Sequence, residues 1–537
     1  MTTCADRKYW IITLLMAVAL PVAAQSWLDY DQVLMRYPLL NTGNSAALTT
    51  YAPDDSLLTL LGEARLTMGL TSGRLQPLNA SPQAWDAGAG VRSIYRMNRR
   101  VVVQGSMDYG YRWGNKAGGS VWIDADRMPF DITETADSTR GVMSLENYHL
   151  HGGLGVDVGG GVSLGTRVDY TTASGAKKKD PRHTTSLMDL EAGVGATWHS
   201  DRWTLGTDYR FGRSTEALKF STVGRTDQLY HFLIDFGALY GREESTDGNG
   251  YVGSSHERPL LDIRHGAAVQ ANYHNGLWQW GLEGGWTHRH GHYGIESPSM
   301  IDFNRHNGDQ WDFSSWWQRD GGDCLQRVTA TWHHQVVKDY ERTYRIVTEQ
   351  GVTDVVYYDD RLMGNTCRDQ VGVTALAQWG MNRHAATWSL QAAFFHNRRE
   401  VTSSIYPFYR QQEAHSTGLT LEGTRNWLNR NDGLFMVRLN AGWAGGGGTV
   451  CRDGEYETAT AGTANLVDNP LYLMRQYELL TARRLLLGTD VRYSMPVARH
   501  SMRLYSEVSY RYSQAFDVHY LENGYRHALS LSLGCLF

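Results

Sequence analysis

The sequence predicts an all-β protein: a transmembrane antiparallel β-barrel of about 16 strands, with short periplasmic turns and long extracellular loops. Three observations predict this class. They are an export signal at the N-terminus, repeated segments in which apolar and polar residues alternate, and a last alternating segment that ends on Phe537. The mean hydropathy of -0.43 excludes a bundle of membrane-spanning helices. No stretch after the signal contains the roughly 20 consecutive apolar residues that a helical span requires.

The N-terminus has the order of charge and hydrophobicity that a secretory signal peptide has. Arg7 and Lys8 precede an apolar run from Trp10 to Leu20, and small residues lead to Ala24. A membrane anchor is the alternative, but the run is too short to cross a bilayer core of about 30 Å. We therefore expect three parts: a signal peptide at 1–24, an N-terminal periplasmic or lumen segment at 25–56, and an outer-membrane β-barrel at 57–537.

Composition agrees with a barrel of many short strands. The chain of 537 residues contains 30 Tyr, 18 Trp and 57 Gly, but only 12 Pro. Tyr and Trp are typical of the two interfacial girdles of a membrane protein. The net charge of -5 comes with no polybasic stretch, so no nucleic-acid partner is expected.

The last segment alternates most clearly. Leu529, Leu531, Leu533 and Phe537 share one face, and small or polar residues occupy the other. The terminal aromatic resembles the signal by which the barrel-assembly machinery recognises its substrates. This machinery is therefore an expected partner, together with outer-membrane lipid and lipopolysaccharide, and the expected location is the outer membrane of a Gram-negative bacterium.

Turns between the alternating segments predict the strand number. Seven tight connections would join seven strand pairs, which with the first and last strands gives about 16, with 14 or 18 as alternatives. The hairpin from Thr331 to Asp359, which turns near Gln350–Gly351, is interpreted as an extracellular extension because no further inner turn is evident. The seven turns are expected near Asn98–Arg99, Gly159–Gly160, Ser200–Asp201, Asn275–Gly276, Asn382–Arg383, Asn429–Asp432 and Pro496–His500.

Charged residues of both signs fall on the polar faces and are candidates for the lumen lining. They are expected to form cross-strand ion pairs, Asp490 with Arg503 among them. A selectivity surface is the alternative. Whether the lumen is open or plugged stays undecided at this point. The candidates are Asp108, Arg112, Arg167, Asp169, Asp208, Arg210, Glu283, Arg438, Asp490, Arg492, Arg503, Glu507 and Arg511.

Aromatic residues gather in the longest segment between predicted strands. Trp311, Phe313, Trp316 and Trp317 are expected in an external loop, where they could bind a ligand or form the loop's own core. On the same topology, a tag inserted at Gly321 should be detected on intact cells.

Histidine and cysteine give weaker signals. His288, His290 and His292 alternate along one strand end and are a weak metal candidate, with a solvated rim patch as the main interpretation. Cys324 and Cys367 bracket the proposed external hairpin, and a disulfide between them stays open.

No catalytic motif is evident. The sequence has no HExxH and no glycine-rich phosphate loop placed between a strand and a helix. Neither enzymatic activity nor a cofactor is expected.

Several short motifs give the whole mature chain a family resemblance. Trp85–Gly88 opens a strand, Tyr109 and Tyr111 follow on the next, Glu146–Tyr148 leads another, and Asp180–Arg182 lies in a loop. The chain resembles an uncharacterised outer-membrane barrel family of Bacteroidota, classed as a domain of unknown function. Its N-terminal segment also resembles faintly that of fatty-acid-transporter-like barrels and of barrels serving type 9 secretion. The resemblance implies a barrel fold and brings no catalytic or binding residues.

Two functional hypotheses follow. The first is a channel or transporter for an unidentified small solute, which a barrel of this size can accommodate. The second is a non-transporting accessory or partner protein of an outer-membrane secretion or uptake complex.

Overall fold

The computed structural model describes residues 30–51, 60–134, 136–223, 229–246, 258–297, 300–381, 385–458, 466–497, 502–521 and 523–537. The predicted signal peptide lies outside these residues, as do the predicted turn at Asn382–Arg383 and residues 498–500 of the predicted turn at Pro496–His500. Among the described helices, none is both long and apolar enough to cross a membrane.

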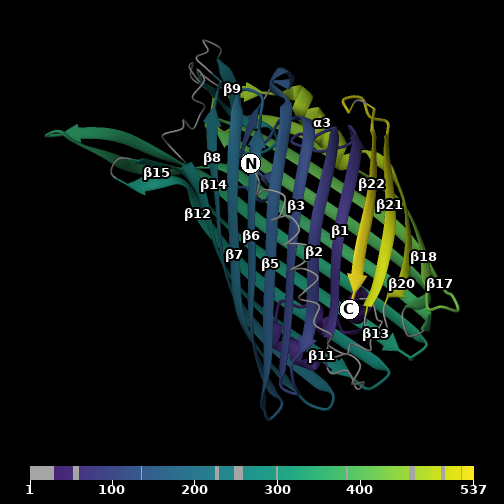
Figure 1. Cartoon of the computed structure of the whole chain (residues 1–537). Helices are drawn as coiled ribbons and strands as arrows, with labels where there is room; N and C mark the ends of the chain where they lie inside the picture. The colour runs from purple at the N-terminus through teal and green to yellow at the C-terminus, as the bar shows by residue number, and fades with distance from the viewer. Residues whose placement is uncertain are drawn as a thin grey trace, which may run out of the picture.

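Eighteen strands form one closed antiparallel barrel (Figure 1). Strand β1 pairs with β2 on one side and with β22 on the other, which closes the sheet. The predicted fold class is confirmed, with the strand number at the upper end of the expected range. The barrel strands are β1 (Leu60–Gly73), β2 (Gln83–Arg96), β3 (Val101–Ala117), β5 (Gly141–Gly159), β6 (Val162–Lys177), β7 (Arg182–His199), β8 (Trp203–Ser221), β11 (Arg258–His274), β12 (Trp278–Ser297), β13 (Met300–Asp320), β14 (Cys324–Glu349), β15 (Val352–Met381), β16 (Ala386–Ile405), β17 (Phe408–Leu428), β18 (Leu434–Glu455), β20 (Arg483–Val497), β21 (Met502–Phe516) and β22 (Tyr525–Leu536).

The outer face of the barrel is apolar. On β1, Leu66, Met68 and Leu70 are 59%, 64% and 62% exposed. Since strand side chains alternate, the residues between them face the lumen. A closed barrel satisfies its backbone hydrogen bonds internally and can present this surface only to lipid. The protein is therefore an integral outer-membrane β-barrel.

Every connection at the end where β22 finishes is short, whereas the long connections all lie at the opposite end. We assign the first end to the periplasm and the second to the outside. One short connection was missing from the sequence interpretation: Gly321–Asp323 joins β13 to β14. There Gly322 adopts a φ of 81°, and its backbone N–H donates to Asp320 Oδ1 over 3.0 Å. This turn accounts for the two additional strands.

The predicted external aromatic loop is therefore wrong. Trp311, Phe313, Trp316 and Trp317 lie on β13, which spans the membrane, and Gly321 lies at the periplasmic end. The error has a physical cause. The lumen side of β13 carries charged residues such as Asp312, so the segment has the composition of a loop although every second residue faces lipid.

Strands β14 and β15 span the membrane and then continue as a two-stranded extension (Figure 1). Strand β14 pairs with β13 only as far as Glu341, and β15 pairs with β16 only from Gly364 onward. The extension thus comprises residues 342–363, and the prediction that the whole hairpin from Thr331 is extracellular is wrong for its lower part.

A second sheet closes the extracellular end. It consists of β4 (Asp131–Glu134), β9 (Tyr230–Asp235), β10 (Tyr240–Thr246) and β19 (Leu466–Asp468). Its apolar side chains pack against inward residues of the wall. Trp122, Phe130 and Tyr293 make edge-to-face ring contacts within one buried cluster. Helix α3 (Pro470–Thr481) follows β19 at the same end (Figure 1).

The N-terminal segment closes the periplasmic end. It contains α2 (Tyr30–Arg36) and the 3-10 helices η1 (Pro38–Asn41) and η2 (Ser45–Thr50). Tyr30, Leu48 and Tyr51 form a buried cluster with Leu61 and Ile94 near the periplasmic ends of β1 and β2. Residues 30–51 are called the N-terminal closure below.

Candidate functional site in the lumen

A chamber lies between the two closures. Three adjoining cavities of about 450, 450 and 660 Å³ compose it. The first two share Gln391 and Glu422, and the first and third share Arg511 and Ala528. The N-terminal closure borders the chamber through Met35, and the extracellular loop before β4 borders it through residues 123–127.

Small inward residues make room for this chamber. Gly69, Gly88, Gly110, Ala528 and Ser530 line its widest part, along β22, β1, β2 and β3. Nearer the periplasmic end of β6, the lumen is filled. There the N-terminal closure lies directly on the wall, so a Cβ on Gly165 would meet the backbone nitrogen of Ala46 at 2.1 Å.

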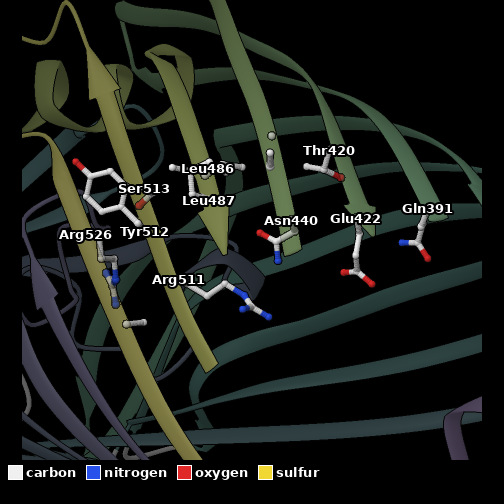
Figure 2. A pocket seen from close by; sticks show the side chains of 13 residues that line it. Gln391, Thr420, Glu422, Asn440, Leu486, Leu487, Arg511, Tyr512, Ser513 and Arg526 are labelled. Carbon is white, nitrogen blue, oxygen red and sulfur yellow. The ribbon is translucent and has the colours of Figure 1, made fainter. Parts of the chain in front are cut away.

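Arginine dominates the chamber electrostatically. Arg511 binds Asp490 with both terminal nitrogens, at 2.6 and 2.9 Å, and Arg438 approaches the same carboxylate at 3.7 Å. Asp490 is only 1% exposed, whereas the Arg511 side chain is 45% exposed. Figure 2 shows Arg511 on β21, Asn440 on β18 and Glu422 on β17, with β20 between β21 and β18. The acid is thus buried behind guanidinium groups that face the chamber.

The predicted pair of Asp490 with Arg503 is wrong. Register places Asp490 opposite Ser509 and Arg503 opposite Pro496, so the two residues lie at different heights. Arg503 instead donates to Ser494 Oγ at 3.2 Å and to the Asp432 backbone oxygen at 2.7 Å.

The other candidate lumen residues lie on the inward faces and pair locally. Arg112 pairs with Asp86, Arg167 with Asp169, Arg210 with Asp208 and Glu283, Arg492 with Glu507, and Asp108 with Arg65. Most of these contacts join residues two apart on one strand or neighbours on adjacent strands, whereas Arg65–Asp108 and Arg210–Glu283 each reach across one intervening strand. Sequence patterning identified the face but not the partners, because register decides which charges meet.

Polar contacts hold the N-terminal closure in place. Asn44 Nδ2 donates to the backbone oxygens of Ala196 and Thr207 at 3.1 and 3.2 Å, and to Gln270 Oε1 at 3.2 Å. Across the lumen, Arg327 Nη1 donates to the Met35 backbone oxygen at 2.7 Å. Nothing in the amino-acid pattern of this segment indicated contacts with strands more than a hundred residues away.

Buried carboxylates anchor the extracellular sheet. Glu134 forms an ion pair with Lys177 and lies 3.5 Å from His183 Nδ1. Although burial opposes ionisation, the nearby His183 ring and the Lys177 charge hold the pKa of Glu134 below its ordinary value. Asp131 and Asp235 face each other in the ladder between β4 and β9. Burial raises the pKa of Asp131 to about 7, and it raises the pKa of Asp235 as well.

The remaining candidates lie away from the chamber. His288, His290 and His292 share the outward face of β12, where His288 Nδ1 lies 3.0 Å from Asp309 Oδ1. Trp311, Phe313 and Trp317 are lipid-facing, and Trp316 is buried towards the lumen.

Cys324 and Cys367 are free thiols. Cys324 lies opposite Trp379 at the periplasmic end of β14, and Cys367 lies opposite Val336, far along the same hairpin. The disulfide that the sequence left open is therefore absent. In the described part of the chain, one group of three residues could hold a metal ion: His334, Cys367 and Asp369.

Together, the closed barrel, its lipid-facing surface and its occluded polar chamber define an integral outer-membrane barrel. The chain belongs to the Family of unknown function (DUF6850), whose model matches residues 46–537. The predicted membership of a family of unknown function is thereby confirmed, whereas the predicted Bacteroidota source and the faint likenesses stay predictions.

Among curated proteins, none matches the chain. Solved structures of similar fold include the ferric preacinetobactin receptor BauA of Acinetobacter baumannii, at 9% identity and a TM-score of 0.35, covering 88% of this chain and 80% of that one. The ferric-catecholate import receptor Fiu of E. coli K12 has 9% identity, a TM-score of 0.37 and coverage of 90% and 82%. The outer membrane transporter YddB of Escherichia coli has 8% identity, a TM-score of 0.37 and coverage of 88% and 81%.

Proposed function

We propose that the protein is a gated channel or transporter for a small anionic solute. The observation that carries this proposal is the chamber itself: a polar space within the barrel, bordered at each end by an inserted segment rather than by the wall. A segment held by side-chain hydrogen bonds can leave the lumen without breaking the barrel ladder. Displacement of the N-terminal closure would open the chamber to the periplasm.

The charge of the lining supports an anionic solute. Arginines outnumber acids among the residues that border the chamber, and arginine recognises carboxylate and phosphate groups with paired hydrogen bonds. The bordering arginines are Arg112, Arg127, Arg327, Arg438, Arg492, Arg503, Arg511 and Arg526, and the bordering acids are Asp31, Asp86, Asp124 and Glu422.

Two of these arginines have no carboxylate within ion-pair distance in the described part of the chain. Arg526 donates to Gln76 Oε1 at 3.3 Å, and Arg327 donates to a backbone oxygen. Both guanidinium groups are therefore available to an anion that enters the chamber.

Conductance in planar bilayers tests the proposal. We expect the full-length barrel to be silent or to open briefly, and a variant lacking residues 30–51 to conduct steadily. In a potassium chloride gradient, the reversal potential of the deletion variant should indicate anion selectivity, and Arg526→Gln should reduce it. A deletion variant that inserts normally but never conducts would contradict passage.

A second candidate function rests on the extension of β14 and β15. In the strand ladders of the described residues, 342–363 pair only with each other, so both outer edges of this hairpin lie outside the barrel sheet. Such edges can take up another strand. Two results together would favour an accessory role. The protein would show no conductance in bilayers, and a partner would co-purify with the intact protein but not after deletion of residues 344–358. That the chain is not an enzyme stays a prediction.

A further inference from the structure

Three side chains of different chemistry meet on the outward face of the β14–β15 hairpin. His334 on β14 lies directly opposite Asp369 on β15, and Cys367 is two residues before Asp369 and therefore on the same face. His334 Nδ1 lies 2.6 Å from Asp369 Oδ1, and Cys367 Sγ lies 4.0 Å from Asp369 Oδ2. One nitrogen, one sulfur and one oxygen atom of the three all lie within 4.8 Å of one another.

The surroundings place this group at the outer interface of the membrane. The Trp311 and Trp332 rings lie 5.4 and 5.9 Å from the His334 ring. Indole rings are typical of the level where lipid head groups begin. All three side chains are partly exposed, so an ion can reach them from the extracellular side.

Neighbouring charges favour a cation. Strand register places Glu400 opposite Cys367, and Glu413 opposite Glu400. Arg398 pairs with both glutamates and neutralises one negative charge. Three carboxylates against one guanidinium leave the patch negative, which raises the local concentration of divalent cations.

We propose that His334, Cys367 and Asp369 form a binding site for a divalent metal ion of borderline softness, with zinc as the best fit. Imidazole, thiolate and carboxylate are the ligands that zinc takes, at about 2.0–2.3 Å. Ligand atoms around such an ion lie about 3.3–3.8 Å apart, which follows from tetrahedral geometry and those bond lengths. The His334–Asp369 hydrogen bond must therefore open slightly, and Cys367 must approach. Its thiol proton is released to solvent as the thiolate binds the ion.

Three protein ligands leave the fourth position for water or for an oxygen of a lipid head group. The bound ion would also connect β14 to β15 just below the point where they leave the barrel sheet. It would thereby stiffen the base of the extension without touching the lumen. The site is thus independent of the proposed transport function.

Zinc binding to the detergent-solubilised full-length barrel, purified without a histidine tag, tests the proposal. We expect one zinc ion per barrel by titration calorimetry and, with cobalt as the probe, a thiolate-to-cobalt absorption band. Cys367→Ser should abolish the band and weaken zinc binding by more than about 100-fold, beyond the usual loss for residues outside the ligand set. Asp369→Asn should weaken binding while the band remains.

Two matched variants serve as controls. Cys324→Ser removes a free thiol at the periplasmic end of β14, and His288→Ala removes an outward histidine of β12 that also pairs with an aspartate. Both should bind zinc as the unmodified barrel does. Equal zinc affinity in Cys367→Ser and Cys324→Ser, or a cobalt complex without a thiolate band, would overturn the proposed site.

Discussion

Replacement of Asp490 by Asn tests how the lumen wall is stabilised. Asp490 is almost fully buried and receives two hydrogen bonds from Arg511, and Arg438 stands nearby. A hydrogen bond to a charged group contributes about 1.5–3 kcal/mol to stability. Because nearly half of the Arg511 side chain is open to the chamber, water can replace part of what is lost. We therefore expect the free energy of unfolding to fall by about 1.5 kcal/mol, the low end of this range.

A double-mutant cycle separates the interaction energy of the ion pair from the destabilisation that each substitution causes by itself. Arg511→Met in the Asp490→Asn background should recover part of the loss, because the second change removes the charge left without its partner. Arg503→Met provides the contrast, since Arg503 lies at another height of the wall and contacts Ser494. Urea-induced unfolding in lipid vesicles measures all members of both cycles. A coupling energy near zero for Asp490 and Arg511, or equal coupling with Arg503, would refute the paired wall.

Three further predictions concern topology, pH dependence and assembly. A tag inserted at Gly321 should be detected only after the outer membrane is opened, because Gly321–Asp323 is a periplasmic turn; detection on intact cells would reverse the assigned orientation. The folded state favours protonated Asp131, whose pKa is raised to about 7, so stability of the extracellular sheet should fall as pH rises from about 4 to about 7. Hydrogen exchange over residues 119–134 should show this loosening, and Asp131→Asn should reduce its pH dependence, with the remainder due to Asp235. Deletion of Phe537 should lower outer-membrane abundance; its backbone pairs with Gly62 across the seam, so undiminished insertion would count against a role in assembly.

The barrel class could be predicted from the sequence because lipid imposes one simple rule on every strand. The outward residues of β1 and β22 must be apolar, and this constraint is local and has a period of two. The exception was β13, where dense charge on the lumen side concealed the alternation. In a filled lumen, inward residues are as polar as those of a loop, so only the outward residues Trp311, Phe313 and Trp317 carried the signal.

The closures could not be predicted in the same way. Asn44 in the N-terminal closure donates to Gln270 on β11, and the two residues are separated by 226 positions in the sequence. Such a contact leaves no periodicity in the sequence, because it depends on where the wall curves and which inward residues are small. The glycines of β6 and β7 that admit the N-terminal closure are indistinguishable, from the sequence alone, from glycines that merely widen a pore.

The proposed metal site could be predicted from the sequence only in part. The hairpin turn at Gln350–Gly351 was evident in the sequence, and its two-residue loop pairs Glu349 with Val352. Continued without interruption, this register would place His334 opposite Cys367. Two β-bulges, at Asp339/Tyr340 and Thr343/Tyr344, shift the pairing, so His334 faces Asp369 instead. Each bulge adds one residue to β15. Because two residues are added in total and side chains alternate with a period of two, the β15 side chains below the bulges still face outward. The three ligands would thus be neighbours with or without the bulges. The bulges determine which of the two β15 ligands is directly opposite the imidazole.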